Sequence, residues 1–112
     1  MTKERIEIAV RFWAKVDKDG LVPERRPELG PCWNWIGARN NIGYGIFTVE
    51  RTNKYAHRVV LALLGNEPPV GLQVDHLCRN RRCVNPAHLE IVTARENEVV
   101  VKVLPDSLRR VH

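Results

Sequence analysis

The sequence predicts a small protein of the α+β class, and two observations lead to that prediction. Apolar residues recur at helical spacing in two segments, 4–16 and 58–64, while short runs with strand character lie between and after them. The chain has 112 residues, of which 44% are hydrophobic, enough to bury one modest core. It contains no internal repeat and no low-complexity segment. We therefore expect a single domain spanning residues 1–112.

The N-terminal third is predicted to contain one helix followed by one long loop. The helix is expected over residues 4–16, because its apolar residues fall on one face and its charged residues on the other. These apolar residues are Ile6, Ala9, Val10, Trp13 and Val16. Segment 17–31 holds three prolines and two glycines, a composition typical of a loop.

The middle of the chain is predicted to contain short strands and a second helix. Residues 33–36 and 44–49 have strand character and are joined by a turn rich in asparagine and glycine. A further short strand near 54–56 leads into an apolar helix over 58–64. Gly65 follows that helix directly and is expected to cap its C-terminus.

The C-terminal part is predicted to run strand, loop, strand, helix. The strands are expected at 72–76 and 89–93. Thr93 and Glu96 have the spacing of a capping box, which places Asn97 in the first turn of the last helix. An apolar residue is usual at that position, so a polar amide there is a weak indication of function.

Charge and cysteine content indicate which kind of partner and which cellular compartment to expect. There are 18 basic and 13 acidic residues, a net charge of +5, and 13 of the 18 are arginine. Arginine binds phosphate oxygens in pairs, which favours a nucleic-acid partner, although a basic protein without one has the same balance. The 3 cysteines cannot all pair within one chain, and no signal peptide or membrane-length apolar run is present. We therefore expect an intracellular protein, in the cytoplasm of a phage-infected or bacterial cell, with reduced thiols and no membrane partner.

One loop has the spacing of a metal site. Four residues separate Cys78 from Cys83, and four more separate Cys83 from His88. Two thiolates and an imidazole at such spacing are typical ligands of zinc, whereas the alternative is a pair of small buried hydrophobic side chains. A further ionisable residue, His76, precedes the loop and is flanked by Asp75.

These motifs together resemble the HNH, or His-Me finger, endonucleases. The resemblance rests first on the order of Asp75-His76, Cys78, Cys83, His88-Leu89 and Asn97. Further matching pieces are Phe12-Trp13, Val16-Asp17, Cys32-Trp33-Asn34-Trp35, Gly43-Tyr44-Gly45 and Ala56-His57-Arg58. The resemblance spans residues 11–97, and the zinc loop is similar to that of His-Cys box homing endonucleases and of small bacteriophage HNH enzymes.

The resemblance implies a fold and a reaction. The fold is a ββα-metal core over about 72–103, with 105–112 as a C-terminal tail. The implied activity is metal-dependent cleavage of DNA to 5′-phosphate and 3′-hydroxyl ends. His76 corresponds to the general base, and Asp75 and Asn97 correspond to the ligands of a catalytic Mg²⁺ or Mn²⁺ ion. Simpler interpretations are a structural histidine, a carboxylate that neutralises nearby arginines, and an ordinary helix-start asparagine.

The resemblance also implies a second, structural metal. It places a zinc ligand at Cys32, the cysteine that remains, so that the ligand set becomes Cys32, Cys78, Cys83 and His88. Such a site would tie the strand near Trp33 to the loop beside His76. The alternative for Cys32 is a simple core thiol.

Basic residues near these motifs are the candidates for DNA binding. Arg79, Arg81 and Arg82 lie in the zinc loop and are predicted either to bind phosphates or to form a solvated cluster. Arg58, beside His57, is the other candidate, with a salt bridge to Glu50 or Glu67 as its alternative. The three tryptophans are expected to pack in the core rather than to stack on bases.

Three functional hypotheses follow. The favoured one is a stand-alone DNA endonuclease, nicking or homing-like, acting as a monomer or homodimer. The alternative is a non-catalytic, zinc-stabilised DNA-binding module derived from such an enzyme. A hydrolase with its water on the zinc is disfavoured, because four protein ligands leave no open position.

Overall fold

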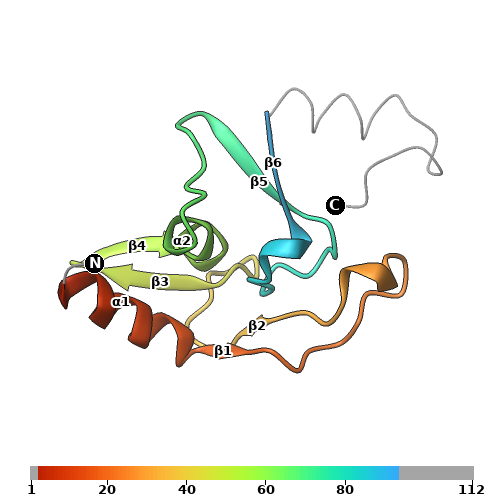
Figure 1. Cartoon of the computed structure of the whole chain (residues 1–112), viewed down its shortest axis with the longest axis horizontal. Coiled ribbons are helices and arrows are strands. Elements are labelled where there is room, and N and C mark those ends of the chain that lie inside the picture. Colours follow the sequence, from red (N-terminus) through yellow and green to blue (C-terminus); the bar gives the residue numbers. More distant parts are fainter. Residues whose placement is uncertain (1–2, 94–112) are drawn as a thin grey trace.

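The computed structural model describes residues 3–93, and these form a small α+β fold as predicted (Figure 1). Two α-helices alternate with six short strands and two 3₁₀ turns. In chain order they are α1 (Lys3–Trp13), β1 (Val16–Asp17), η1 (Pro27–Leu29), β2 (Asn34–Trp35), β3 (Ile46–Val49), β4 (Thr52–Tyr55), α2 (Ala56–Leu63), β5 (Leu72–His76), η2 (Pro86–His88) and β6 (Leu89–Thr93). No helix among the described residues is long and apolar enough to cross a membrane.

The strands form three separate antiparallel pairs rather than one sheet. β1 pairs with β2, β3 with β4, and β5 with β6. The strands predicted at 33–36 and 44–49 are present in shorter form as β2 and β3, but they do not pair with each other. The turn between them contains an isolated bridge between Arg39 and Gly45 and is closed by further hydrogen bonds around Asn40. The local pattern indicated strands correctly and could not indicate their partners.

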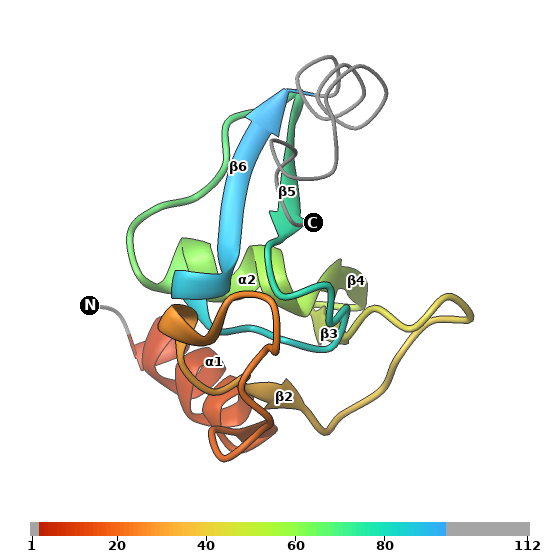
Figure 2. The same cartoon turned by 90° about the vertical axis from the view of Figure 1, so that its right-hand side faces the viewer.

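The β5–β6 hairpin has the bounds expected from the sequence. Its register pairs Leu72 with Thr93 at the open end and His76 with Leu89 next to the loop. The hairpin projects from the rest of the fold, and α2 lies at its base (Figure 2). The helix predicted to follow Thr93, with Asn97 in its first turn, lies outside the described residues.

The core is built around three aromatic rings. The ring centroid of Phe12 on α1 lies 5.0 Å from that of Trp35 and 5.4 Å from that of Phe47, and all three side chains are buried. Trp13 and Trp33 pack at the edge of this core, as expected for the tryptophans. The predicted apolar face of α1 was wrong in part, because Ile6 and Val10 are exposed while Ile8 and Phe12 pack inward. α1 also ends at Trp13, three residues before the predicted end, because Val16 joins β1.

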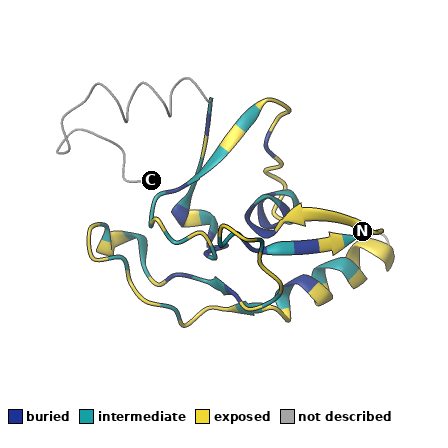
Figure 3. Cartoon of the chain, turned by 180° about the vertical axis from the view of Figure 1, so that it is seen from behind, coloured by how far each residue is buried: buried dark blue, intermediate teal, exposed yellow. Residues whose placement is uncertain are grey.

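α2 connects the aromatic core to the β5–β6 hairpin. It begins at Ala56, earlier than predicted, and buries Ala56, Val59 and Val60 among others. Gly65 follows its last turn with a φ of 84°, a conformation that suits glycine, and its N–H donates to the Ala62 carbonyl. The neighbouring β4 is exposed along its whole length, whereas α2 carries several buried residues (Figure 3).

Candidate metal cluster and catalytic cavity

The structure brings the four predicted zinc ligands into one cluster. The Sγ atoms of Cys32, Cys78 and Cys83 and a ring nitrogen of His88 all lie within 4.8 Å of one another. The His88 Nδ1 atom lies 3.6 Å from the Cys32 sulfur and 3.4 Å from the Cys83 sulfur. A zinc tetrahedron with ordinary Zn–S and Zn–N bond lengths requires sulfur–nitrogen separations of about 3.5 Å. The cluster can therefore hold a zinc ion.

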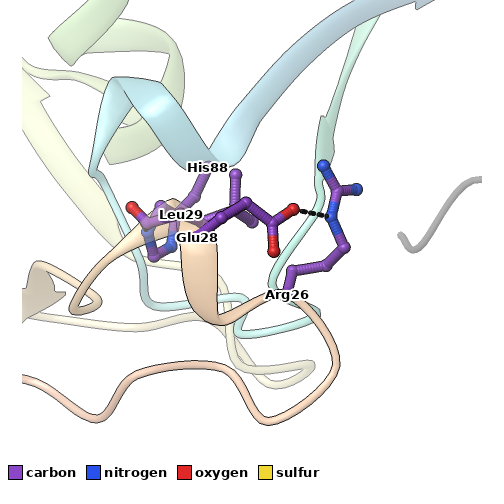
Figure 4. A network of polar contacts seen from close by, with 4 residues as sticks. All are labelled: Arg26, Glu28, Leu29 and His88. Carbon is purple, nitrogen blue, oxygen red and sulfur yellow. Dashed lines mark hydrogen bonds and ion pairs between the residues drawn. The ribbon is translucent and has the colours of Figure 1, made fainter.

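The orientation of His88 also suits a metal ligand. Its Nε2 atom lies 2.9 Å from the Leu29 carbonyl oxygen. Because a carbonyl only accepts, Nε2 carries the proton, and the lone pair of Nδ1 faces the three sulfurs. Leu29 lies in a short loop where Arg26 donates to the Glu28 carboxylate at 2.6 Å (Figure 4). This loop covers the imidazole ring of His88. The sequence pattern did not predict this contact between distant segments.

Several contacts join the cluster to the core. The Asn85 side chain accepts from the Ala87 N–H at 3.0 Å, which starts the η2 turn, and donates to the Pro31 carbonyl at 3.0 Å. The Val84 N–H donates to the Trp33 carbonyl at 2.8 Å. The residues before Cys32 and around Cys83 are thus held side by side. These hydrogen bonds position the segments that carry the predicted ligands, whether or not a metal is bound.

The thiols of the cluster differ in acidity. Hydrogen bonding from the Cys83 thiol lowers the pKa of Cys78 to about 5, and the same contact raises the pKa of Cys83. Burial raises the pKa of Cys32. One thiolate at half-buried Cys78 therefore coexists with two buried thiols, and a bound cation would favour deprotonation of all three.

A second site lies beside the cluster, at the loop end of β5. Asp75 and His76 line a cavity of about 350 Å³, together with Arg79, Arg81 and Tyr44. Asp75 is half-buried and His76 is almost fully buried. Two of the arginines predicted to bind DNA therefore share a cavity with the predicted base and one predicted metal ligand. Asn97, the other predicted ligand of the catalytic ion, lies outside the described residues.

The ring of His76 is held by the zinc loop. Its Nε2 atom lies 3.0 Å from the backbone carbonyl oxygen of Cys83. A carbonyl can only accept, so Nε2 donates and Nδ1 keeps the lone pair. Burial lowers the pKa of His76 below its usual value, which keeps the imidazole neutral at neutral pH. One ring nitrogen of His76 is thus held by a hydrogen bond, and the other keeps a lone pair that can accept a proton.

The remaining predicted DNA-binding residues lie elsewhere. Arg58 donates from Nη1 to the Leu72 carbonyl at 3.2 Å and lines a different cavity, between α1, β4 and α2. Arg82 donates from Nε to the Trp35 carbonyl at 3.3 Å. His57 is buried and packs against His76, with ring centroids 4.6 Å apart, and its Nδ1 has no hydrogen-bond partner among residues 3–93. None of these three lines the His76 cavity.

Sequence reasoning gave no role to Tyr44, which is part of this site. Its ring lies 5.8 Å from that of His76 and 5.5 Å from that of His57. The guanidinium carbon of Arg81 lies 5.2 Å from the same ring. The signal in the sequence was the Gly43-Tyr44-Gly45 motif, which contributed to the resemblance without a stated function.

Comparison with known proteins relates the same part of the chain to a described family. Residues 54–99 match the model of a family described as HNH endonuclease, a stretch that contains the cavity-lining residues of β5 and the zinc loop. The chain is also similar to two proteins of Escherichia phage T7. It is 46% identical to Protein 2.8 over 68 residues, which cover 59% of this chain and 45% of that protein.

The second relative is more distant. The chain is 35% identical to Protein 7.7 over 66 residues, which cover 59% of this chain and 51% of that protein. The matches thus span about half the length of the relatives. No solved structure matches the chain. The segment 54–99 is therefore similar to the HNH endonuclease family, and it contains His76 and three of the four clustered zinc-type ligands.

Proposed function

We propose that this protein is a metal-dependent DNA endonuclease in which His76 is the general base. The observation that carries the proposal is the anchoring of His76 Nε2 to the Cys83 carbonyl at 3.0 Å, within a cavity that also contains Asp75 and two arginines. A non-catalytic binding module has no need of an oriented, neutral imidazole beside a carboxylate.

In the proposed reaction, His76 Nδ1 removes a proton from a water molecule. The water oxygen then bonds to phosphorus as the bond from phosphorus to the 3′-oxygen breaks. The leaving oxygen takes a proton from solvent, so that the products are a 5′-phosphate and a 3′-hydroxyl. Burial of His76 supports this role, because it favours the neutral form that accepts a proton.

The carboxylate of Asp75 fits a hard divalent cation such as Mg²⁺ or Mn²⁺, with Asn97 proposed as the second protein ligand. Such an ion supplies positive charge that stabilises the phosphate oxygens and the leaving oxygen in the transition state. Asp75 lies next to His76 in the chain and lines the same cavity. It would therefore hold the ion within reach of the phosphate on which His76 acts.

The Cys32, Cys78, Cys83 and His88 cluster is proposed as a separate, structural zinc site. Four protein ligands leave no position for substrate, so this metal would take no part in the chemistry. Its proposed role is to fix the loop whose Cys83 carbonyl orients His76.

Supercoiled plasmid DNA tests the proposal. Zinc-loaded wild-type protein is expected to nick or linearise the plasmid with added Mg²⁺ or Mn²⁺ and not without it. His76→Ala is expected to lower the rate by about a hundredfold or more while it keeps its zinc, and because His76 is buried, thermal unfolding must show that the variant is folded at the assay temperature. Nicked circles alone indicate action on one strand, and linear product indicates paired cuts.

Two results would contradict the proposal. If folded, zinc-loaded protein binds DNA but cleaves none with any divalent ion tried, the DNA-binding module becomes the better interpretation. If His76→Ala cleaves as fast as wild type, the base lies elsewhere or the activity belongs to a contaminant.

A further inference from the structure

Hydrogen bonds hold the turn before β3 together, and one of its residues, Tyr44, lines the His76 cavity. The Asn40 side-chain oxygen accepts from the Ile42 N–H at 3.2 Å and from the Tyr44 N–H at 2.9 Å. The Asn40 N–H in turn donates to the Tyr44 carbonyl at 2.9 Å. Gly43 has a φ of 95°, which suits glycine. These contacts fix both the Ile42 carbonyl and the base of the Tyr44 side chain.

Arg81 is held by this turn from across the cavity. Its Nη1 donates to the Ile42 carbonyl at 2.7 Å, and its guanidinium carbon lies 5.2 Å from the Tyr44 ring centroid. One hydrogen bond uses a single N–H of the five that a guanidinium carries. No carboxylate in the described part of the chain pairs with Arg81. The side chain is thus oriented but keeps its charge and most of its donors for another anion.

Tyr44 also contacts the proposed base. Its ring centroid lies 5.8 Å from that of His76, with the two planes tilted by 34°. One aromatic ring therefore packs against both Arg81 and His76, and all three side chains line the same cavity of about 350 Å³. Arg82 differs, because it does not line this cavity and its Nε donates instead to the Trp35 carbonyl.

We propose that Tyr44 is a positioning residue, whose ring holds Arg81 beside His76 so that the guanidinium binds a backbone phosphate of DNA. The identity of this ligand rests on the proposed nuclease function. Arginine is suited to the task, because its planar fork binds two phosphate oxygens at once and stacks on an aromatic ring. A pre-oriented side chain also loses less conformational freedom when the phosphate binds.

A double-mutant cycle on DNA binding tests this proposal without requiring cleavage. The affinity of the full chain for a fluorescent duplex is measured by anisotropy, with zinc present and no added magnesium. Arg81→Gln is expected to weaken binding roughly tenfold and to reduce the slope of log affinity against log salt by about one unit. Arg25→Gln removes an equal charge from an exposed loop outside the cavity and is the matched control, expected to stay within about twofold of wild type.

The second arm of the cycle concerns Tyr44. Tyr44→Leu is expected to weaken binding about fivefold alone, and to add less than about twofold when Arg81 is already Gln, because the tyrosine acts through the arginine. Tyr44→Phe keeps the ring and is expected to recover most of the loss. Thermal unfolding of each variant identifies any that fails to fold. If Tyr44→Leu fails to fold, the DNA affinity of Tyr44→Phe decides whether the ring of Tyr44 has the positioning role.

The outcomes separate this proposal from the nuclease proposal. Fully multiplicative losses in the double variant, or an Arg81→Gln protein that binds like Arg25→Gln, would overturn the positioning role even if the wild type cleaves DNA. The expected cycle in a protein that never cleaves would support the phosphate site and count against the nuclease. A wild-type protein that binds no DNA would overturn both.

Discussion

The Nε2 atom of His76 lies 3.0 Å from the backbone carbonyl oxygen of Cys83, a residue of the metal-type cluster. The proposed base and the proposed structural metal are therefore linked by one hydrogen bond. The Cys83 N–H donates to the Asn80 carbonyl, so the carbonyl that faces His76 belongs to a folded turn. Any contact or metal that holds this loop in place therefore also determines that Nδ1 of His76, rather than Nε2, can accept a proton.

Removal of the structural metal is the first test of that link. We expect one zinc per chain, and extraction with a strong chelator is expected to lower the free energy of unfolding by about 4 kcal/mol or more. Three buried or half-buried cysteines and a buried histidine would then lose their common ligand. Urea unfolding with and without zinc measures the change. Restoration by zinc but not by magnesium is the expected control result, and equal stability of both forms would contradict a structural metal.

Cys32 is the proposed ligand furthest in sequence from the others, so its role needs its own test. We expect Cys32→Ala to reduce zinc affinity at least about a hundredfold, measured by competition with a chromophoric chelator. The matched control is Val84→Ala, which shortens a buried side chain beside the cluster without removing a ligand. The control should lose stability and keep its zinc affinity. If both variants keep it, Cys32 is a core thiol.

Much of this site could be predicted because its signals are local. The bounds of β5 and β6 followed from short apolar runs, and they are the observed bounds. Cys78, Cys83 and His88 followed from spacing within one loop. Ligands so close in sequence are constrained to lie close in space, whatever the rest of the fold does.

The features that sequence reasoning missed depend on contacts between distant segments. The pairing of β2 with β1 rather than β3 cannot be deduced from either strand alone. The apolar face of α1 was misplaced because apolar residues occur on two overlapping faces, and packing on Trp35 and Phe47 selects the one that contains Phe12. The role of Tyr44 likewise becomes visible only when Arg81 and His76 are placed beside it.

The contact between Gly45 and Trp35 predicts a steric effect on the core. A Cβ atom added to Gly45 would lie 2.7 Å from the nearest atom of the buried Trp35 ring. That ring packs against Phe12 and Phe47 and has little room to move. Gly45→Ala is therefore expected to lower the free energy of unfolding by about 1–3 kcal/mol, measured in urea. An unchanged unfolding curve would mean that the ring shifts at no cost.

His57 predicts how stability depends on pH. Burial, followed by the charges of His76 and Arg58, lowers the pKa of His57 from 6.5 to about 3. Between these values the unfolded chain binds a proton at this residue and the folded chain does not, so this residue makes stability fall as the pH falls below about 6.5. The loss is about 1 kcal/mol between about pH 7.5 and about pH 5.5.

The matched variant is His57→Phe, because Phe keeps an aromatic ring between Tyr44 and Tyr55 and has no nitrogen to protonate. It also removes a buried Nδ1 that has no hydrogen-bond partner in the described part of the chain, so we expect the variant to be at least as stable as wild type at neutral pH. Its advantage should grow by about 1 kcal/mol as the pH is lowered over that range. Urea unfolding of both proteins at saturating zinc measures the difference between their free energies of unfolding at each pH. The other titrating groups are the same in both proteins, so their contributions cancel in this difference. Parallel pH profiles for the two proteins would show that His57 is protonated in the folded state as readily as in the unfolded chain.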